Sequence, residues 1–143
     1  MKNRLVQCWH SFRVLPLWVQ IWVAGILVPV NALAFLMLDS CAGKLTAIAA
    51  LFVVLTNIPI MLIERGMSKL MAIPHLIAWY PLVIILIVQL FSTGSRQEAG
   101  DMEWTFMILV VFINGISLVF DTKDSIDWFR GNRAIPGHEE SNG

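Results

Sequence analysis

Three polar side chains lie inside long apolar stretches of the sequence, and they could do chemistry there: Asn57, His75 and Asn114. Each of them is six or seven residues from a charged residue at one end of its stretch, namely Glu64, Lys69 or Asp121. At a helical rise of 1.5 Å per residue, all three would lie roughly 10 Å inside the same boundary. We therefore expect them to meet at one level of a helical assembly, with the aromatic ring of Trp79 beside His75.

An imidazole can bind a proton or a metal, whereas an amide side chain only donates and accepts hydrogen bonds. Two interpretations of the three side chains stay open: hydrogen bonding between helices, or a site for a ligand, an ion or a proton. Under both, we expect His75 to have a polar partner, because an unsatisfied N–H group in hydrocarbon is costly. Asn31 is expected in the opposite half of its stretch, away from the other three.

Catalytic and metal-binding patterns are not evident in the sequence. His75 is the only histidine within an apolar stretch. The two cysteines, Cys8 and Cys41, are expected on opposite faces and form no C-x-x-C motif. We find no zinc-protease motif, phosphate-binding loop or nucleophile elbow. The sequence therefore predicts a protein that is not an enzyme, with no metal site and no cofactor.

The composition indicates a membrane protein. Hydrophobic residues make up 57% of the 143 residues and charged residues only 14%, whereas a soluble domain averages about 25% charged residues. Disorder is excluded because it requires few apolar residues. Ten basic residues balance ten acidic ones, so no basic excess is present to bind a nucleic acid.

Four stretches contain no Asp, Glu, Lys or Arg: residues 14–38, 45–63, 70–91 and 104–120. A helix needs about 20 apolar residues to cross a bilayer, with a range of roughly 17–25. None of the stretches shows the alternation of a membrane β-strand. We expect a single all-α membrane domain over residues 1–143, in which four transmembrane helices form an antiparallel bundle. The third connection, residues 92–103, is the longest loop.

The segments outside these stretches set the expected orientation. Residues 1–13 read as an interfacial helix with Leu5, Cys8, Trp9 and Phe12 on its apolar face. Residues 121–143 form the predicted tail, whose first part continues the fourth helix. The N-terminal segment, the second loop and the tail hold eight of the ten basic residues, which are Lys2, Arg4, Arg13, Arg65, Lys69, Lys123, Arg130 and Arg133. The positive-inside rule then predicts cytoplasmic termini in an inner membrane.

Aromatic residues near the ends of the stretches are expected to anchor the helices at the membrane surface. These anchors are Trp9, Phe12, Trp18, Trp104 and Trp128.

Three parts of the sequence carry a family resemblance. They are residues 57–64 followed by Arg65-Gly66-Met67-Ser68-Lys69-Leu70, then Ile73-Pro74-His75-Leu76 with Trp79 and Pro81, and then residues 114–121 with Asp124, Asp127-Trp128 and Arg130-Gly131-Asn132-Arg133. Together they resemble a family of small, uncharacterised four-helix proteins of proteobacterial inner membranes. The resemblance implies the fold and the compartment, and it implies no activity.

These observations favour a non-enzymatic accessory or interaction subunit that acts through helix packing. Its expected partners are the lipid bilayer and either another membrane protein or a second copy of the chain. The alternative is a small homo-oligomeric transporter or channel with a polar site near Asn57, His75 and Asn114. An enzyme or redox subunit that uses His75 as a base or ligand is the least favoured hypothesis.

Overall fold

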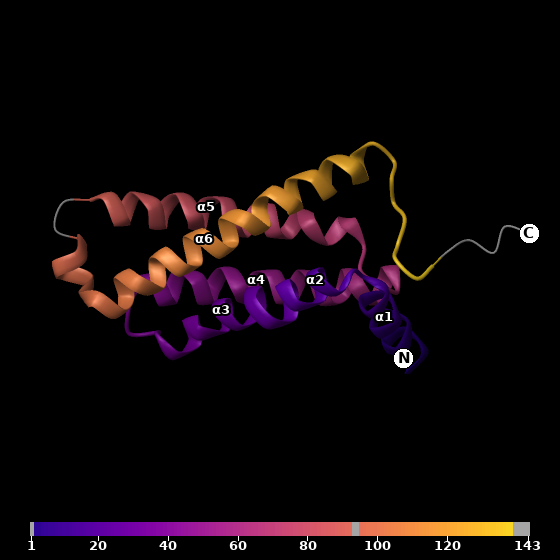
Figure 1. The fold of residues 1–143 in the computed structure, drawn as a ribbon, viewed down its shortest axis with the longest axis horizontal. Helices are drawn as coiled ribbons and strands as arrows, with labels where there is room; N and C mark the ends of the chain where they lie inside the picture. Colours follow the sequence, from indigo (N-terminus) through magenta and orange to yellow (C-terminus); the bar gives the residue numbers. More distant parts are fainter. Residues whose placement is uncertain (1, 93–94, 139–143) are drawn as a thin grey trace, which may run out of the picture.

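The structure is a computed structural model that describes residues 2–92 and 95–138, and these residues are helical apart from short connections (Figure 1). The elements are α1 (Lys2–Val14), α2 (Leu17–Gln20), η1 (Ile21–Leu27), α3 (Val28–Ala32), η2 (Leu33–Leu36), α4 (Cys41–Glu64), η3 (Lys69–Met71), α5 (Ala72–Phe91) and α6 (Ser95–Phe129).

Four of the described helical segments are long and apolar enough to cross a membrane: Leu17–Leu36, Cys41–Glu64, Lys69–Phe91 and Gly100–Phe129. They confirm the four apolar helices that the sequence predicts. The first is shorter than expected, because Pro16 separates it from α1 and the residue before a proline avoids helical geometry.

The first apolar helix, Leu17–Leu36, is irregular. Its α2 and α3 segments flank η1, a stretch of π-helix, and η2 closes it with a 3-10 turn. Pro29 lies two residues after the π-helical stretch, and a proline has no N–H with which to continue the ladder of hydrogen bonds. The N–H of Val28 bonds five residues back to the carbonyl of Val23, which is the wide spacing of a π-turn.

The ends of the longer helices have local causes. Ser40 caps α4, and its side chain accepts a hydrogen bond from the N–H of Gly43. Arg65 ends α4 in the left-handed conformation with a φ of 61°, an arrangement common at helix C-termini. Gly100 kinks α6 with a φ of 76°. The predicted loop over residues 92–103 is therefore wrong in part, because α6 already begins at Ser95.

The core lies mainly between α5 and α6, which make the most extensive contact of any two elements. Leu86, Met107 and Val110 are almost wholly buried in it. Small residues let the other helices approach this core closely, since Ala34 and Ala42 are fully buried as well. At Gly43, a Cβ would overlap the backbone carbonyl of Met37.

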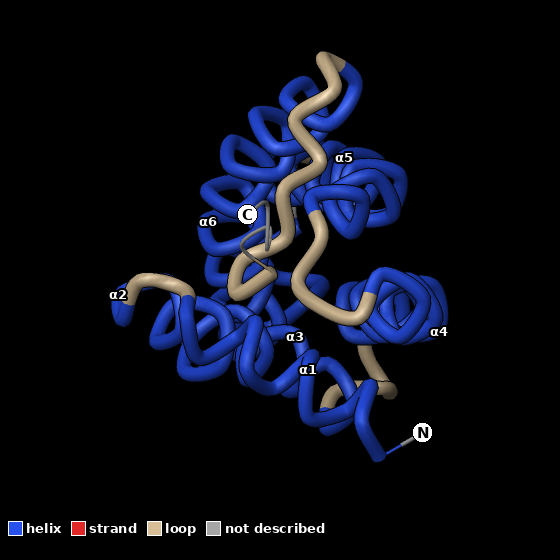
Figure 2. The backbone as a smooth tube through the Cα atoms, turned by 90° about the vertical axis from the view of Figure 1, so that its right-hand side faces the viewer, coloured by secondary structure: helices blue, strands red, loops and turns tan. Residues whose placement is uncertain are grey.

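Three segments that are distant in the sequence meet at one end of the molecule: α1, the connection between α4 and η3, and residues 130–138 (Figures 1 and 2). The Cys8 thiol donates to the carbonyl of Met61 over 3.2 Å, and the N–H of Met67 donates to Ser11 Oγ over 2.9 Å. The His138 Nε2 atom donates to the carbonyl of Arg65 over 3.0 Å. We call this arrangement the end cap.

The end cap corrects the expected apolar face of the N-terminal helix. Cys8 is buried beneath α1, together with Ser11, whereas Leu5 and Trp9 are exposed. The prediction grouped Cys8 with Trp9 because both are apolar. The carbonyl of Met61 near the end of α4 explains the difference, since a thiol can donate a hydrogen bond to it.

Gly66 should control the docking of α1, because a Cβ at this position would lie 2.6 Å from Ile135 Cγ2 and 2.7 Å from Ser11 Oγ. We expect Gly66→Leu to push α1 away from α4 and to expose Cys8. In a Cys41→Ala background, a membrane-permeant maleimide should then label Cys8 about tenfold faster, because overpacking costs about 1–3 kcal/mol.

Gly115→Leu is the matched control, since a Cβ there meets nothing within 4 Å. Equal labelling rates in the two variants would contradict this account of α1.

Candidate functional site

The structure joins His75 to side chains from two other helices. His75 lies on α5, Asn57 on α4 and Asp121 on α6. Asn57 Nδ2 is 3.0 Å from His75 Nε2, and His75 Nδ1 is 3.1 Å from Asp121 Oδ1. Ser117 Oγ donates to the second carboxylate oxygen of Asp121 over 3.1 Å. We call Asn57, His75, Ser117 and Asp121 the His75 centre.

The partners of His75 determine its tautomer. A carboxylate only accepts hydrogen bonds, so Nδ1 carries the hydrogen that it donates to Asp121. The amide nitrogen of Asn57 only donates, so Nε2 accepts from it through its lone pair. The ring is therefore satisfied at both nitrogen atoms as a neutral imidazole. The sequence predicted a polar partner for His75, and the structure supplies two.

Asn114 does not join this centre, which corrects the expectation that the three polar residues meet. It forms two reciprocal hydrogen bonds with Asn31, of 2.8 and 2.9 Å, and both residues are buried. Asn31 Nδ2 also donates to the carbonyl of Leu27 over 2.9 Å. The expectation placed Asn31 too far away to take part.

Asn114 lies deeper in the bundle than expected, because its depth was counted from Asp121 and Asp121 is not the boundary of the apolar region. Asp121 is itself packed between helices, with only 13% of its side chain exposed. Asn114 is seven residues earlier in α6, roughly 10 Å farther along the helix. Asn114, Ser117, Asp121 and Asp124 follow one another at spacings of three or four residues. This polar stripe of α6 was the available signal for Asp121.

Two polar atoms beside the His75 centre have no hydrogen-bond partner within the part of the chain that the structure describes. They are Asn57 Oδ1 and Trp79 Nε1. Trp79 is 3% exposed, and its ring centroid is 6.3 Å from that of His75. The structure thus places Trp79 beside His75, as expected, within the packed core.

Charged groups continue the polar stripe of α6 beyond the centre. Asp127 Oδ2 is 3.0 Å from Lys123 Nζ and 3.3 Å from Lys69 Nζ. The Asp127 carboxylate therefore pairs with two ammonium groups, one on α6 and one before α5.

In the other direction from the centre, the inward face of α6 is apolar. Beyond Asn114 it presents Val110, Met107 and Phe106, all buried. Polar contacts resume at the far end of the helices, where Glu103 Oε1 accepts from the N–H of Ala42 over 2.9 Å. An apolar layer therefore separates the His75 centre from that end.

The predicted anchoring residues differ in exposure. Trp9 is 63% exposed and Trp18 is 58% exposed. Phe12 and Trp104 are half-buried, and Trp104 packs against the core. Trp128 lies 4.5 Å below the guanidinium of Arg133. Trp9 and Trp18 are thus the anchoring residues whose rings remain most accessible to a membrane surface.

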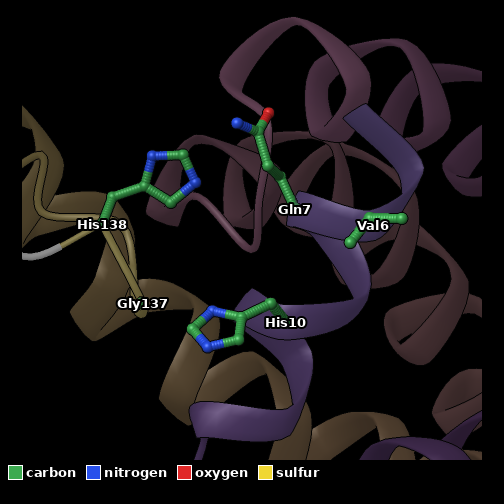
Figure 3. Close-up of a pocket in the computed structure, with 5 residues that line it drawn as sticks. All are labelled: Val6, Gln7, His10, Gly137 and His138. Atoms are coloured by element: carbon green, nitrogen blue, oxygen red, sulfur yellow. The ribbon is translucent and has the colours of Figure 1, made fainter. Parts of the chain in front are cut away.

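A pocket of about 340 Å³ lies between α1 and the residues before the C-terminus (Figure 3). It is lined by Val6, Gln7, His10, Gly137 and His138. Gly137 packs against the His10 ring so closely that a Cβ would come within 2.8 Å of Nδ1. Among residues 2–92 and 95–138, no group of three or more His, Cys, Asp or Glu residues is arranged to hold a metal.

Two substitutions of His75 distinguish the contribution of its hydrogen bonds to stability from the contribution of its volume. His75→Gln keeps one donor and one acceptor, so we expect it to retain most of the free energy of unfolding. His75→Leu leaves Asn57 and Asp121 without their shared partner, and each stranded buried group costs about 1–3 kcal/mol. Unfolding of the detergent-solubilised protein by denaturant, followed by circular dichroism, measures the difference. Ile77→Leu, at an exposed position of the same helix, should unfold as the wild type does. A leucine variant as stable as the glutamine variant would show that the hydrogen bonds contribute nothing.

Neither a protein-family model, nor a curated protein, nor a solved structure matches the chain.

Proposed function

We propose that this chain crosses an inner membrane four times as an antiparallel helical bundle with both termini in the cytoplasm. We further propose that it acts without catalysis, as an accessory or interaction subunit that packs against another membrane protein or a second copy. The four apolar helices support the membrane location. The end cap supports one common side for α1, the α4–η3 connection and the residues after α6, which hold most of the basic residues.

The observation that carries the interaction role is the outward face of the first apolar helix. Ala24, Gly25, Pro29 and Ala32 are all exposed there. Exposed positions recur every three or four residues along this helix, and Gly25, Pro29 and Ala32 are three of them. We call these four residues the small-residue face. Only 11% of the most apolar window of this helix is buried, against 28% or more for the other three.

Small residues on a membrane helix favour close contact with another helix. Lipid chains are as apolar as leucine, so helices in a bilayer associate through close packing and hydrogen bonds. A glycine or alanine lets two backbones approach, and a Cβ on Gly25 would meet only Ile21 Cγ2, at 3.8 Å. The small-residue face therefore supports packing of the first helix against a partner helix.

The alternative role of a transporter or channel has one supporting observation, the His75 centre between three helices. The arrangement of buried groups within one chain speaks against a continuous path. Asn31 and Asn114 satisfy each other, and Val110 and Met107 fill the next layer. A conducting pore would need a different arrangement or several copies.

Two matched glycine variants test the interaction role. We expect Gly25→Leu to weaken association at least about tenfold, a loss of about 1.4 kcal/mol, because the added side chain keeps the partner helix away. Gly115→Leu adds the same bulk in an open place on α6 and should leave association unchanged. Cross-linking in native membranes, followed by affinity purification and measurement of the mass of the complex, detects either kind of partner.

Equal association of the wild type and both variants would contradict the role of the small-residue face. A protein that purifies only as a monomer, and that carries ions across liposome membranes, would favour the alternative.

The orientation can be tested with new cysteines, because the buried Cys8 would resist labelling on either side of the membrane. In a Cys8→Ser, Cys41→Ala background, Lys44→Cys and Asn132→Cys place thiols at exposed positions. An impermeant maleimide should label Lys44→Cys in intact cells and Asn132→Cys only after permeabilisation. The reverse pattern would place both termini outside the cytoplasm.

A further inference from the structure

One polar atom of the Asn57 side-chain amide makes no hydrogen bond within the His75 centre. With His75 neutral, Asn57 donates its Nδ2 hydrogen to Nε2, and its Oδ1 atom is buried without a partner among the described residues. An amide can turn about its Cβ–Cγ bond and exchange the places of its nitrogen and oxygen. The turned amide would place an acceptor where the donor now lies, which suits an imidazole that carries a hydrogen on Nε2.

The geometry points to a proton-binding site at His75 in which the Asn57 amide turns over when the proton binds. The proton passes from a hydronium ion to the lone pair of Nε2, and a water molecule is left behind. The imidazolium then donates from Nδ1 to Asp121 and from Nε2 to Asn57 Oδ1. The Asn57 amide thus has one orientation for each protonation state of the ring. This inference does not depend on the small-residue face.

Charged groups on α6 and before α5 surround the centre. Asp121 lies in direct contact with the ring, and Asp124 and Asp127 follow it on α6. Lys69, before α5, and Lys123, on α6, are the cations that act on these carboxylates. The Asp121 carboxylate already accepts the hydrogen of Nδ1, so an imidazolium at His75 would form an ion pair with it in place.

Further titratable groups border the site. Glu64 ends α4, two turns beyond Asn57, and the Tyr80 hydroxyl on α5 bonds Thr122 Oγ1 over 3.1 Å. Asp124 is the competing acceptor, because it is a carboxylate that lies one turn beyond Asp121 on α6. A test must therefore separate a proton on His75 from a proton on Asp124.

Access to the site is one-sided. About 20% of the His75 side chain and 13% of the Asp121 side chain are exposed, and the charged part of α6 lies beyond them. In the other direction lie the Asn31–Asn114 pair and the apolar layer at Val110. The proton therefore exchanges with the end of the molecule that holds the end cap, and the site binds it without passing it through the bundle.

Nitrogen NMR of the full chain in lipid nanodiscs tests the proposal. In a His10→Gln, His138→Gln background His75 is the only histidine, so ¹⁵N-labelled histidine reports its ring alone, and ¹⁵N-labelled asparagine reports the side-chain amides. At high pH we expect one protonated and one unprotonated ring nitrogen. On acidification the unprotonated signal should be lost, and the side-chain amide signal of Asn57 should shift over the same pH range. Absence of that amide signal in Asn57→Ala identifies it.

Two further variants assign the effect. Asp121→Asn removes the carboxylate that faces the imidazolium, so the coupled change should be lost while the helices persist by circular dichroism. Asp124→Asn removes the competing acceptor and should leave the coupled change in place.

Protonation of His75 without any change at Asn57 would overturn the amide turnover. An unprotonated nitrogen that persists until the helices unfold would overturn the proton site itself. Both results can be read from the unsubstituted centre, so the test stands even if the Asp121 variant does not fold.

Discussion

The constraint on which the rest of the structure depends is that polar groups inside apolar helices must find partners within the chain. Lipid offers no hydrogen bonds, and an unpaired buried group costs several kcal/mol. The polar side chains of the four apolar helices therefore select which helix faces meet. Asn31 and Asn114 join the first helix to α6, whereas Asn57, His75 and Asp121 join α4, α5 and α6. Apolar packing at Leu86 and Val110 then fills the space between these contacts.

The same constraint divides the molecule along its length. At the end that holds the end cap, charged and polar groups extend inward as far as Asn114. In the next layer of α6 the inward side chains are apolar, and polar contacts return at the far end, where Glu103 accepts from the N-terminus of α4 and Gln89 donates to Cys41. The polar groups thus hold the helices together at one end. The apolar layer lies between His75 and the other end, so the proposed proton exchange would occur at the end that holds the end cap.

The four apolar helices could be predicted from the sequence because membrane-length runs without charge leave few alternatives. The contacts of the polar residues could not, because depth along a helix was counted from the first charged residue. Asp121 lies inside the packed helices, so counting from it displaced Asn114 by about two turns. The burial of Cys8 could not be predicted because its partner is the backbone carbonyl of Met61, and no side-chain pattern reveals which carbonyl a thiol will reach. The loop over residues 92–103 was misjudged because a short helical segment precedes Gly100, whose non-helical backbone separates it from the rest of α6.

The first apolar helix shows how an interaction surface can coexist with a stable fold. Asn31 and the ring contact between Trp18 and Phe120, with centroids 5.9 Å apart, hold its inner side to α6. The π-helical stretch before Pro29 changes the rotation of the helix between these two contacts, since each π-turn takes more residues than an α-turn. Asn31 can therefore face inward while Gly25, Pro29 and Ala32 face outward. Leu27 and Ala34 add buried apolar contacts on the same inner side. The exposed small-residue face can therefore receive a partner while the inner side stays packed, and the His75 centre lies between the other three helices.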